Sequence, residues 1–397
     1  MIKPVSKHNR YTELDALRGF ALFGILLANL YSFMGYNTYS PTEITTLPTA
    51  DRSVLFMIDW FVEGKFYSIF SMLFGMGFAL QAIRMEKSQD IFTAYWSRRM
   101  RLLLCIGLFH MFLVWHGDIL TLYSLMGMLL ILFTNFSKRA LLYTSIFLLT
   151  FPIFNHLLVS FTQDASFWSL LSDKSNNWRQ ELGLGDFSLL ELRTSDNADE
   201  VFLINVLRAI TRPIGYLMSA RPAGVLGMFL LGMFLIKSWN DSGNFGQLKK
   251  WPIFFIIGCV TSFGYAWTKY VSGTPYALDD FGFIQSVIYN ISAPCFALGI
   301  VGAFFHYWKN EKIQKLMTFF TPLGRMALTN YLVQNSLAVM IFFGYGLALM
   351  RQIPFAYIPV IASLILLAQW VFSAYWLSRY RQGPLEYLWR KYAYRDY

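Results

Sequence analysis

Residues 14–30 read LDALRGFALFGILLANL and decide the class of fold, because the run is apolar and long enough to form most of a membrane-spanning helix. Asp15, Arg18 and Asn29 interrupt it. The eleven-residue interval from Arg18 to Asn29 is about three helical turns, so the three side chains share one face. A charge in hydrocarbon costs at least ~2.5 kcal/mol, which favours a face that lines the bundle interior or a cavity. The alternative is that Asp15 and Arg18 pair or snorkel at the interface.

The composition extends this interpretation to the whole chain. Hydrophobic residues make up 56% of the 397 residues and charged residues only 14%. Apolar runs of about 20 residues recur from end to end, which predicts an all-α polytopic transmembrane bundle in a single domain, residues 1–397. Ten spans are expected: Asp15–Met34, Phe66–Ile83, Leu102–Trp115, Ile119–Asn135, Ala140–Phe161, Pro222–Trp239, Pro252–Tyr270, Phe283–Tyr307, Pro322–Tyr345 and Pro354–Leu377. The third is short and is expected to begin earlier in the chain.

The distribution of basic residues predicts the orientation. With the N-terminus inside, 22 of the 33 Lys and Arg residues lie on the cytoplasmic side. Both termini are therefore predicted to be cytoplasmic. The net charge of +10 is explained by this belt facing anionic membrane lipids, and we do not expect nucleic-acid binding.

One long polar interruption divides the chain into two halves of five spans each. Residues 162–212 contain eight acidic residues among scattered apolar ones, which predicts an extracytoplasmic loop with short amphipathic helices on the membrane surface. The three cysteines, Cys105, Cys259 and Cys295, lie in apolar segments without metal-site spacing, so we expect core residues and no metal site.

Histidine chemistry is suggested by the sequence HMFLVWHGD, residues 110–118. His110 follows Arg99 by eleven residues, so the two share a helix face about 16 Å apart. Histidine is the usual general base near neutral pH, and a carboxylate such as Asp118 can orient it. His116 is the second candidate for the same role. A packing histidine and an ordinary Gly-Asp turn remain the alternatives.

Two further polar groups are candidate cavity walls. Asp59, Glu63 and Lys65 precede the second expected span and are assigned to the acceptor side of the same outer vestibule as His116. The ninth expected span carries Asn330, Tyr331, Gln334 and Asn335, whose i,i+4 spacing makes a broad polar arc. Interhelical hydrogen bonding alone is the competing explanation for that arc.

Five ordered motifs carry a resemblance to a known family. They are Leu14-Asp-x-Leu-Arg-Gly-Phe-Ala, Gly64-Lys-Phe with Leu73-Phe-Gly-x-Gly, His110 through Gly117-Asp-Ile-Leu, Gly324-Arg-Met-Ala-Leu-Thr-Asn-Tyr, and Gly383-Pro-Leu-Glu-Tyr-Leu-Trp-Arg390. Together they resemble the YeiB-like family of bacterial inner-membrane proteins and span almost the full chain. The resemblance implies a multi-pass protein of the bacterial cytoplasmic membrane.

A more distant similarity suggests a chemistry. An Asp-x-x-Arg-Gly helix ending in Asn, with a late Asn-Tyr helix, is similar to the transmembrane acyltransferase superfamily. Those enzymes carry an acyl group from cytosolic acyl-CoA to an acceptor across the membrane and use a membrane-embedded histidine. Their essential histidine follows soon after the first helix, whereas residues 19–109 of this chain contain none. His110 or His116 would have to replace it.

The leading hypothesis is therefore an acyl-CoA-dependent or acetyl-CoA-dependent acyltransferase. The residues expected to hold the donor are Asp15, Arg18, Asn29, Arg98, Arg99, Arg101, Arg325, Asn330 and Gln334. The acceptor is expected to be a small molecule, glycan or lipid with a hydroxyl or amine. A transporter or exporter of a small polar or amphiphilic molecule is the alternative. An accessory lipid-binding subunit is a third interpretation, and a homo-oligomer is left open.

Cysteine labelling tests the predicted topology. A cysteine introduced near Asn177 should react with a membrane-impermeant reagent in intact cells, because the positive-inside distribution places this loop outside. Labelling near Gln247 with protection near Asn177 would invert the orientation.

Overall fold

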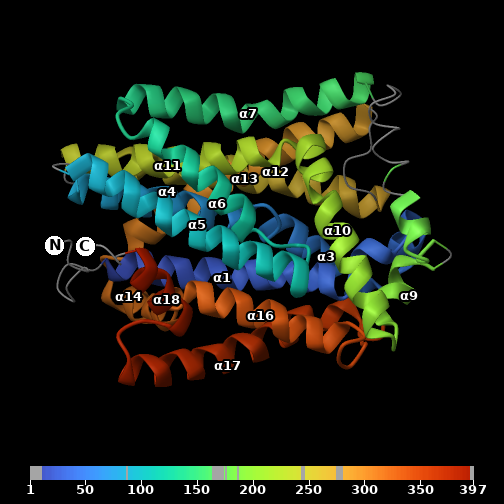
Figure 1. The fold of residues 1–397 in the computed structure, drawn as a ribbon. Helices are drawn as coiled ribbons and strands as arrows, with labels where there is room; N and C mark the ends of the chain where they lie inside the picture. The colour runs from blue at the N-terminus through green and yellow to red at the C-terminus, as the bar shows by residue number, and fades with distance from the viewer. Residues whose placement is uncertain are drawn as a thin grey trace.

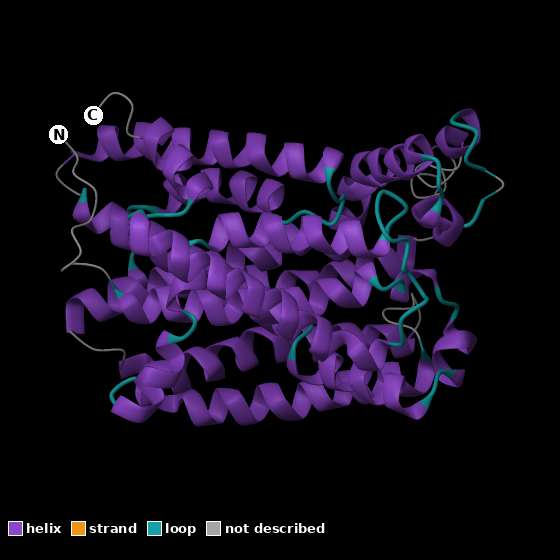
Figure 2. Ribbon diagram, turned by 90° about the horizontal axis from the view of Figure 1, so that it is seen from below, coloured by secondary structure: helices purple, strands orange, loops and turns teal. Residues whose placement is uncertain are grey.

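The part of the chain that the structure describes consists of helices and the irregular segments that connect them. The computed structural model describes residues 11–85, 88–162, 174, 177–185, 187–242, 246–273 and 280–393, and within these ranges it contains helices and no strand (Figure 2). The all-α prediction is therefore confirmed.

Long helices run side by side along one direction and form the body of the molecule (Figure 1). They are α1 (Thr12–Phe33), α4 (Lys65–Arg84), α5 (Gln89–Leu113), α7 (Lys138–Thr162), α11 (Arg221–Ser242), α12 (Trp251–Ser272), α13 (Asp280–Tyr307), α16 (Ala327–Phe342) and α17 (Ile358–Arg379). The start of α1 and the helix α18 lie at the same end of this bundle, called the terminus end below. The other end is called the far end.

Other helices complete the two ends and the connections. The long one is α10 (Ala198–Ser219), and the shorter ones are η2 (Tyr36–Thr38), α2 (Pro41–Thr46), α3 (Thr49–Phe61), α6 (Leu120–Leu129), η4 (Leu130–Phe133), α9 (Leu189–Thr194), η5 (Gly246–Lys250), α14 (Glu311–Thr318), α15 (Thr321–Arg325), η6 (Phe355–Tyr357) and α18 (Pro384–Ala393).

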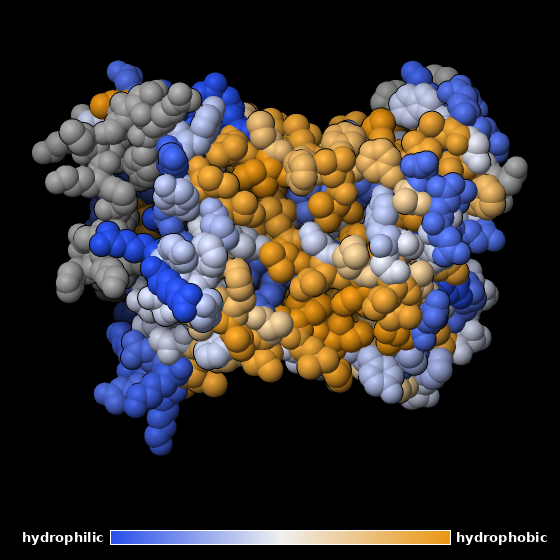
Figure 3. Space-filling view, turned by 60° about the horizontal axis from the view of Figure 1, so that its bottom comes forward, coloured by the Kyte–Doolittle hydropathy of each residue, from blue (hydrophilic) through white to orange (hydrophobic). Residues whose placement is uncertain are grey.

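On the face that Figure 3 shows, apolar residues cover the middle of the bundle and hydrophilic residues lie at both ends. Large apolar side chains such as Phe154 of α7 and Leu364 of α17 are exposed, as lipid-facing residues are. Within the described residues, eight segments are long and apolar enough to cross a membrane. The chain is thus a multi-pass membrane protein.

The eight segments differ from the ten expected spans in identifiable ways. The helix α5 begins at Gln89, earlier than Leu102, as expected for the short third span, and its arginines exclude it from the eight. The fourth and ninth expected spans are shorter helices. Conversely, α10 is among the eight although the sequence assigned it to the outer loop. Figure 1 shows α10 lying crosswise at the far end, as a surface helix does.

The rest of the expected loop 162–212 is described only in part. Residues 163–173, 175–176 and 186 lie outside the described residues. The helices α9 and α10 follow them, and side chains cap both, Ser188 for α9 and Asn197 for α10. Helices in this interval were expected, although α10 is longer than the short segments predicted.

The cysteines depart from the expected core positions. Cys105 is exposed, and Cys259 and Cys295 are partly buried. All three are free thiols in apolar helices, so an apolar segment did not by itself mean a buried one, because one face of each helix meets lipid.

A close contact joins the first turns of α1 to α15. A Cβ atom added at Gly324 would lie 1.8 Å from the carbonyl oxygen of Asp15, and one at Gly19 would lie 2.0 Å from that of Phe320. The two backbones touch because neither position has a side chain. This contact holds Arg325 beside the first helix.

We expect Gly324→Ala to lower the melting temperature of the purified protein, because the added methyl group must push the backbones of α1 and α15 apart. Overpacking of this kind costs about 1–3 kcal/mol. Gly224→Ala in α11 is the matched control, since nothing lies within 4 Å of its added Cβ. Equal melting temperatures for wild type and both variants would refute the tight α1–α15 contact.

Candidate functional site

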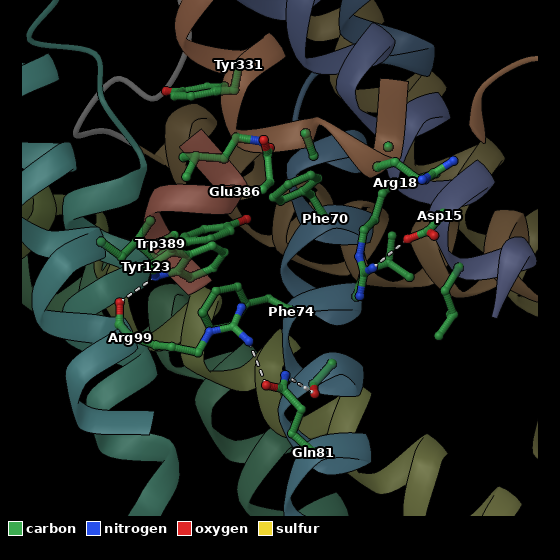
Figure 4. A pocket seen from close by; sticks show the side chains of 18 of the residues that line it. Asp15, Arg18, Phe70, Phe74, Gln81, Arg99, Tyr123, Tyr331, Glu386 and Trp389 are labelled. Atoms are coloured by element: carbon green, nitrogen blue, oxygen red, sulfur yellow. Dashed lines mark hydrogen bonds and ion pairs between the residues drawn. The ribbon is translucent and has the colours of Figure 1, made fainter. Parts of the chain in front are cut away.

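A cavity of about 290 Å³ lies between α1, α4, α5, α15, α16 and α18 and reaches inward from the terminus end (Figure 4). It is called the central cavity below. Its outer part is lined by Tyr11, Arg84 and Arg390, at the ends of their helices. Its deeper part is lined by apolar and aromatic side chains, among them Ile25, Phe70, Leu73, Phe74, Ile119, Tyr123 and Tyr331.

The lining of the central cavity carries an excess of positive charge. Five arginines face two carboxylates in it: Arg18, Arg84, Arg99, Arg325 and Arg390 against Asp15 and Glu386. Asp15 accepts a hydrogen bond from Arg18 at 3.1 Å. Glu386 is engaged with the start of α16, where it accepts hydrogen bonds from the backbone of Leu328 and Thr329. The cavity therefore favours an anionic ligand.

Arg99 is held by several neighbouring side chains. Its Nη1 donates to Gln81 Oε1 at 2.6 Å and to the Tyr95 hydroxyl at 2.9 Å, and its guanidinium lies 4.1 Å from the centre of the Trp389 ring. The indole of Trp389 in turn donates to the Arg99 carbonyl (Figure 4). The Nε of Arg99 is buried and has no hydrogen-bond partner among the described residues. A bound oxyanion could satisfy this donor.

His110 lies behind the deep end of the central cavity. Tyr331 lines the cavity, and the centre of its ring is 5.5 Å from that of His110. His110 itself is completely buried, and Tyr331 stands between it and the cavity. The expected base is thus close to the cavity but does not line it.

A chain of hydrogen bonds fixes the orientation of His110. Its Nδ1 donates to Asp118 Oδ1 at 3.0 Å, and Asp118 Oδ2 accepts from the backbone of Thr121. On the other side, Asn335 Nδ2 donates to His110 Nε2 at 3.4 Å, and Asn29 donates to Asn335. This set, called the His110 network, leaves Nε2 as the basic nitrogen of the ring.

His116 belongs to a different arrangement at the far end. Its backbone N–H and its Nδ1 both bond to Asn205 Oδ1 of α10, and its Nε2 accepts from Arg193 at 3.3 Å. Burial, together with the charges of Arg193 and Arg212, holds the pKa of His116 well below its usual value. The imidazole is therefore neutral near pH 7 and already bonded at both nitrogens. The expected open vestibule around His116 and Asp118 is instead covered by α10.

The expected acceptor-side residues form an ion-pair network of their own. Lys269 donates to Asp59 Oδ1 at 2.7 Å and lies 3.5 Å from Glu63 Oε2, while Lys65 donates to the Asp59 carbonyl. Within the described chain, no hydrogen bond or ion pair joins them to His116 or Asp118. Asp59 and Lys269 are buried because each neutralises the other. The structure therefore does not bring them to the vestibule expected from the sequence.

The remaining expected donor-binding residues are divided between the cavity and other places. Asp15, Arg18, Arg99 and Arg325 line the central cavity. Asn330 instead donates to Ser373 of α17, and Asn29 joins the His110 network.

Three others also lie outside the cavity lining. Gln334 is buried, and neither polar atom of its amide has a partner among the described residues. Arg98 is half-buried, and Arg101 is exposed on α5. Because adjacent helical residues are about 100° apart, only Arg99 of the three arginines can point to the cavity.

Sequence reasoning missed several residues that complete these sites. Glu386 and Trp389 come from the last helix and lie in a motif quoted for the resemblance, which was the available signal. Lys269 and Arg193 are lone cations far from their partners in the sequence. Their signal was a charge beside an apolar run, without any indication of its partner.

Comparison with known proteins agrees with the fold. Residues 241–396 match a family described as "Protein of unknown function (DUF418)". The chain is 28% identical to "Uncharacterized protein YxaH" of Bacillus subtilis (strain 168), over 99% of this chain and 96% of that protein. It is also 28% identical to "Uncharacterized protein YeiB" of Escherichia coli (strain K12), over 96% of each. No solved structure matches the chain.

The fold and the central cavity define a polytopic α-helical membrane protein with a basic, partly apolar cavity at one end. The matches to YxaH and YeiB extend over nearly the whole chain, and the DUF418 match covers its C-terminal part. The chain is therefore similar to YxaH and YeiB over nearly its whole length, in agreement with the resemblance of its motifs.

Proposed function

We propose that this protein is a membrane-embedded acyltransferase that uses acyl-CoA as donor. The observation that carries the proposal is the position of the His110 network directly behind the deep end of a cation-rich cavity. A buried Asp-His pair beside an anion-attracting cavity is the arrangement that acyl transfer to a hydroxyl or amine needs.

The lining of the central cavity fits the two parts of an acyl-CoA. Arg99, Arg325 and Arg390 would bind its phosphates through charge-assisted hydrogen bonds. The deeper aromatic and aliphatic walls would hold the slender pantetheine arm. At about 290 Å³ the cavity suits that arm, so the nucleotide would remain at the terminus end.

The His110 network supplies the base. Asp118 accepts from Nδ1 and so keeps the lone pair on Nε2. Nε2 would take the proton of the acceptor hydroxyl or amine while that atom bonds to the thioester carbonyl carbon. The carbon–sulfur bond then breaks, and the sulfur receives the proton. Tyr331 stands between the cavity and the imidazole, so its ring must turn aside for this contact.

The proposed location follows from the basic belt and the relatives. With the termini cytoplasmic, the central cavity opens to the cytosol, where acyl-CoA is made, and the far end faces outward. YxaH and YeiB come from bacteria, which supports the bacterial cytoplasmic membrane.

Transport of a small polar or amphiphilic molecule is the second candidate. The observation that favours it is the ion pair of Lys269 and Asp59, which is buried between α12 and α3, with the half-buried Glu63 beside it. Charges in such positions commonly mark a substrate or ion pathway. A transporter of this kind would not need to bind coenzyme A.

Coenzyme A should therefore raise the melting temperature of the purified protein, because a ligand that binds only the native state stabilises it. Arg99→Gln and Arg18→Gln should reduce the shift, because each removes a cation from the central cavity.

Arg101→Gln is the matched control on the same helix. Arg101 is exposed outside the cavity, so this variant should keep the full shift. A wild-type protein that millimolar coenzyme A does not stabilise would remove the donor from the proposal and favour transport.

His110→Ala should lower the rate of hydrolysis or transfer from labelled acetyl-CoA by about 10²- to 10⁴-fold, because the base is lost. His116→Ala should have a smaller effect, because His116 only orients neighbouring groups. The exposed His306→Ala variant is the control for loss of an imidazole. All are compared at equal folded yield.

Two results would contradict this assignment. Unchanged turnover in His110→Ala with loss in His116→Ala would move the base to the far end. Unchanged turnover in both variants would remove histidine from the chemistry.

A further inference from the structure

A buried arginine without an acidic partner lies at the far end of the bundle. Arg193 of α9 is only 3% exposed, and its guanidinium lies 5.5 Å from the centre of the Phe343 ring. Its Nη2 donates to His116, but its Nη1 is buried with no hydrogen-bond partner among the described residues. A buried, unsatisfied donor on a charged group is costly unless a ligand completes it.

Two more cations belong to the same region, because the charges of Arg193, Arg208 and Arg212 all act on His116. Arg208 and Arg212 are one turn apart on α10, and with Arg193 they form what we call the α9–α10 arginine cluster. Arg193 has its pKa lowered to about 9 by burial and by the charge of Arg208. Arg193 is buried, Arg212 is half-buried and Arg208 is exposed, so the cluster has an open side.

The acidic residues nearby are engaged elsewhere. Asp118 accepts from His110 and Thr121, and Glu200 accepts from Ser195 and Asn197. In the described part of the chain, no carboxylate forms an ion pair with any member of the cluster. Among the described residues, the three guanidinium groups therefore have no carboxylate partner, and the charges of all three act on His116.

We propose that the α9–α10 arginine cluster is a binding site for a phosphate group, on an outer-leaflet lipid headgroup or on a water-soluble phosphate ester. The planar guanidinium donates two parallel hydrogen bonds to such an oxyanion, and several positive charges suit its double charge. Neutral His116 accepts from Arg193 and so holds the guanidinium in place. The site is separate from the central cavity.

The cluster is linked to the His110 network through one tyrosine. Arg212 Nε donates to the Tyr216 hydroxyl at 3.3 Å, and this hydroxyl donates to the Asp118 carbonyl at 3.3 Å. A phosphate held by the cluster would therefore bring the rest of its molecule close to His110. This step rests on the proposed function: a phosphate site close to His110 identifies the acceptor class as a phosphate-bearing alcohol or amine. Phosphate binding itself requires no turnover.

Calorimetric titration of the purified full chain with inorganic phosphate tests the site, in a neutral detergent and without coenzyme A. We expect Arg193→Gln to weaken binding by about tenfold or more, the loss typical of a charged hydrogen bond. Arg208→Gln, on the exposed rim, should weaken it by less and still fold. Arg351→Gln is the control, since Arg351 lies apart from the cluster and pairs with Glu43 at 2.6 Å.

The variants separate this site from the central cavity. The proposal is overturned if neither Arg193→Gln nor Arg208→Gln changes the affinity for phosphate. It is also overturned if Arg99→Gln is the one variant that lowers this affinity. Phosphate binding that depends on Arg193, in a protein that does not bind coenzyme A, supports the phosphate site while the acyltransferase proposal fails.

Two further titrations distinguish the sources of the phosphate. Short-chain phosphatidylglycerol that binds more tightly than glycerol 3-phosphate, with both affinities reduced in Arg193→Gln, supports a lipid headgroup. The reverse order, again dependent on Arg193, supports a water-soluble ester. If neither ligand competes with inorganic phosphate, the assignment to phosphate esters is overturned.

Discussion

Polar groups inside an apolar bundle must satisfy one another, and the arrangement of this protein follows from that constraint. An unpaired charge or amide in such an interior costs several kcal/mol. His110 is therefore buried together with Asp118 and Asn335, and Lys269 together with Asp59. The His110–Asn335 and Lys269–Asp59 pairings join helices that are distant in the sequence. The polar residues thus determine which helices meet, while the apolar residues fill the space between them.

The central cavity and the His110 network illustrate two outcomes of this constraint. Around His110 every polar atom of the imidazole is bonded, so the ring is fixed in one orientation. In the cavity the arginines outnumber the carboxylates, and an anion from solution would restore the balance. A fixed base beside a cation-rich cavity is the basis of the proposed acyl transfer.

Elements outside the main bundle finish both ends. At the terminus end, α18 brings Trp389 onto Arg99 and Glu386 onto the start of α16. At the far end, Asn205 of α10 accepts from the backbone of His116 and donates to the last carbonyls of α5. The two helices are partly exposed and amphipathic, yet they determine which side chains are buried at the two ends. Both helices contribute to the sites through contacts with residues that are distant in the sequence.

The sequence by itself determined the class of fold, the approximate spans and the shared face of Asp15 and Arg18, because hydrophobic length and helical spacing are local properties. Its placement of His110 near Asp118 was also correct, since they are eight residues apart and joined by one turn. Only the tertiary structure decided that Asn330 faces α17, that Lys269 neutralises Asp59 and that α10 covers His116. Helical periodicity gives the face of a side chain but not the helix that packs against it. That choice depends on the packing of the whole bundle.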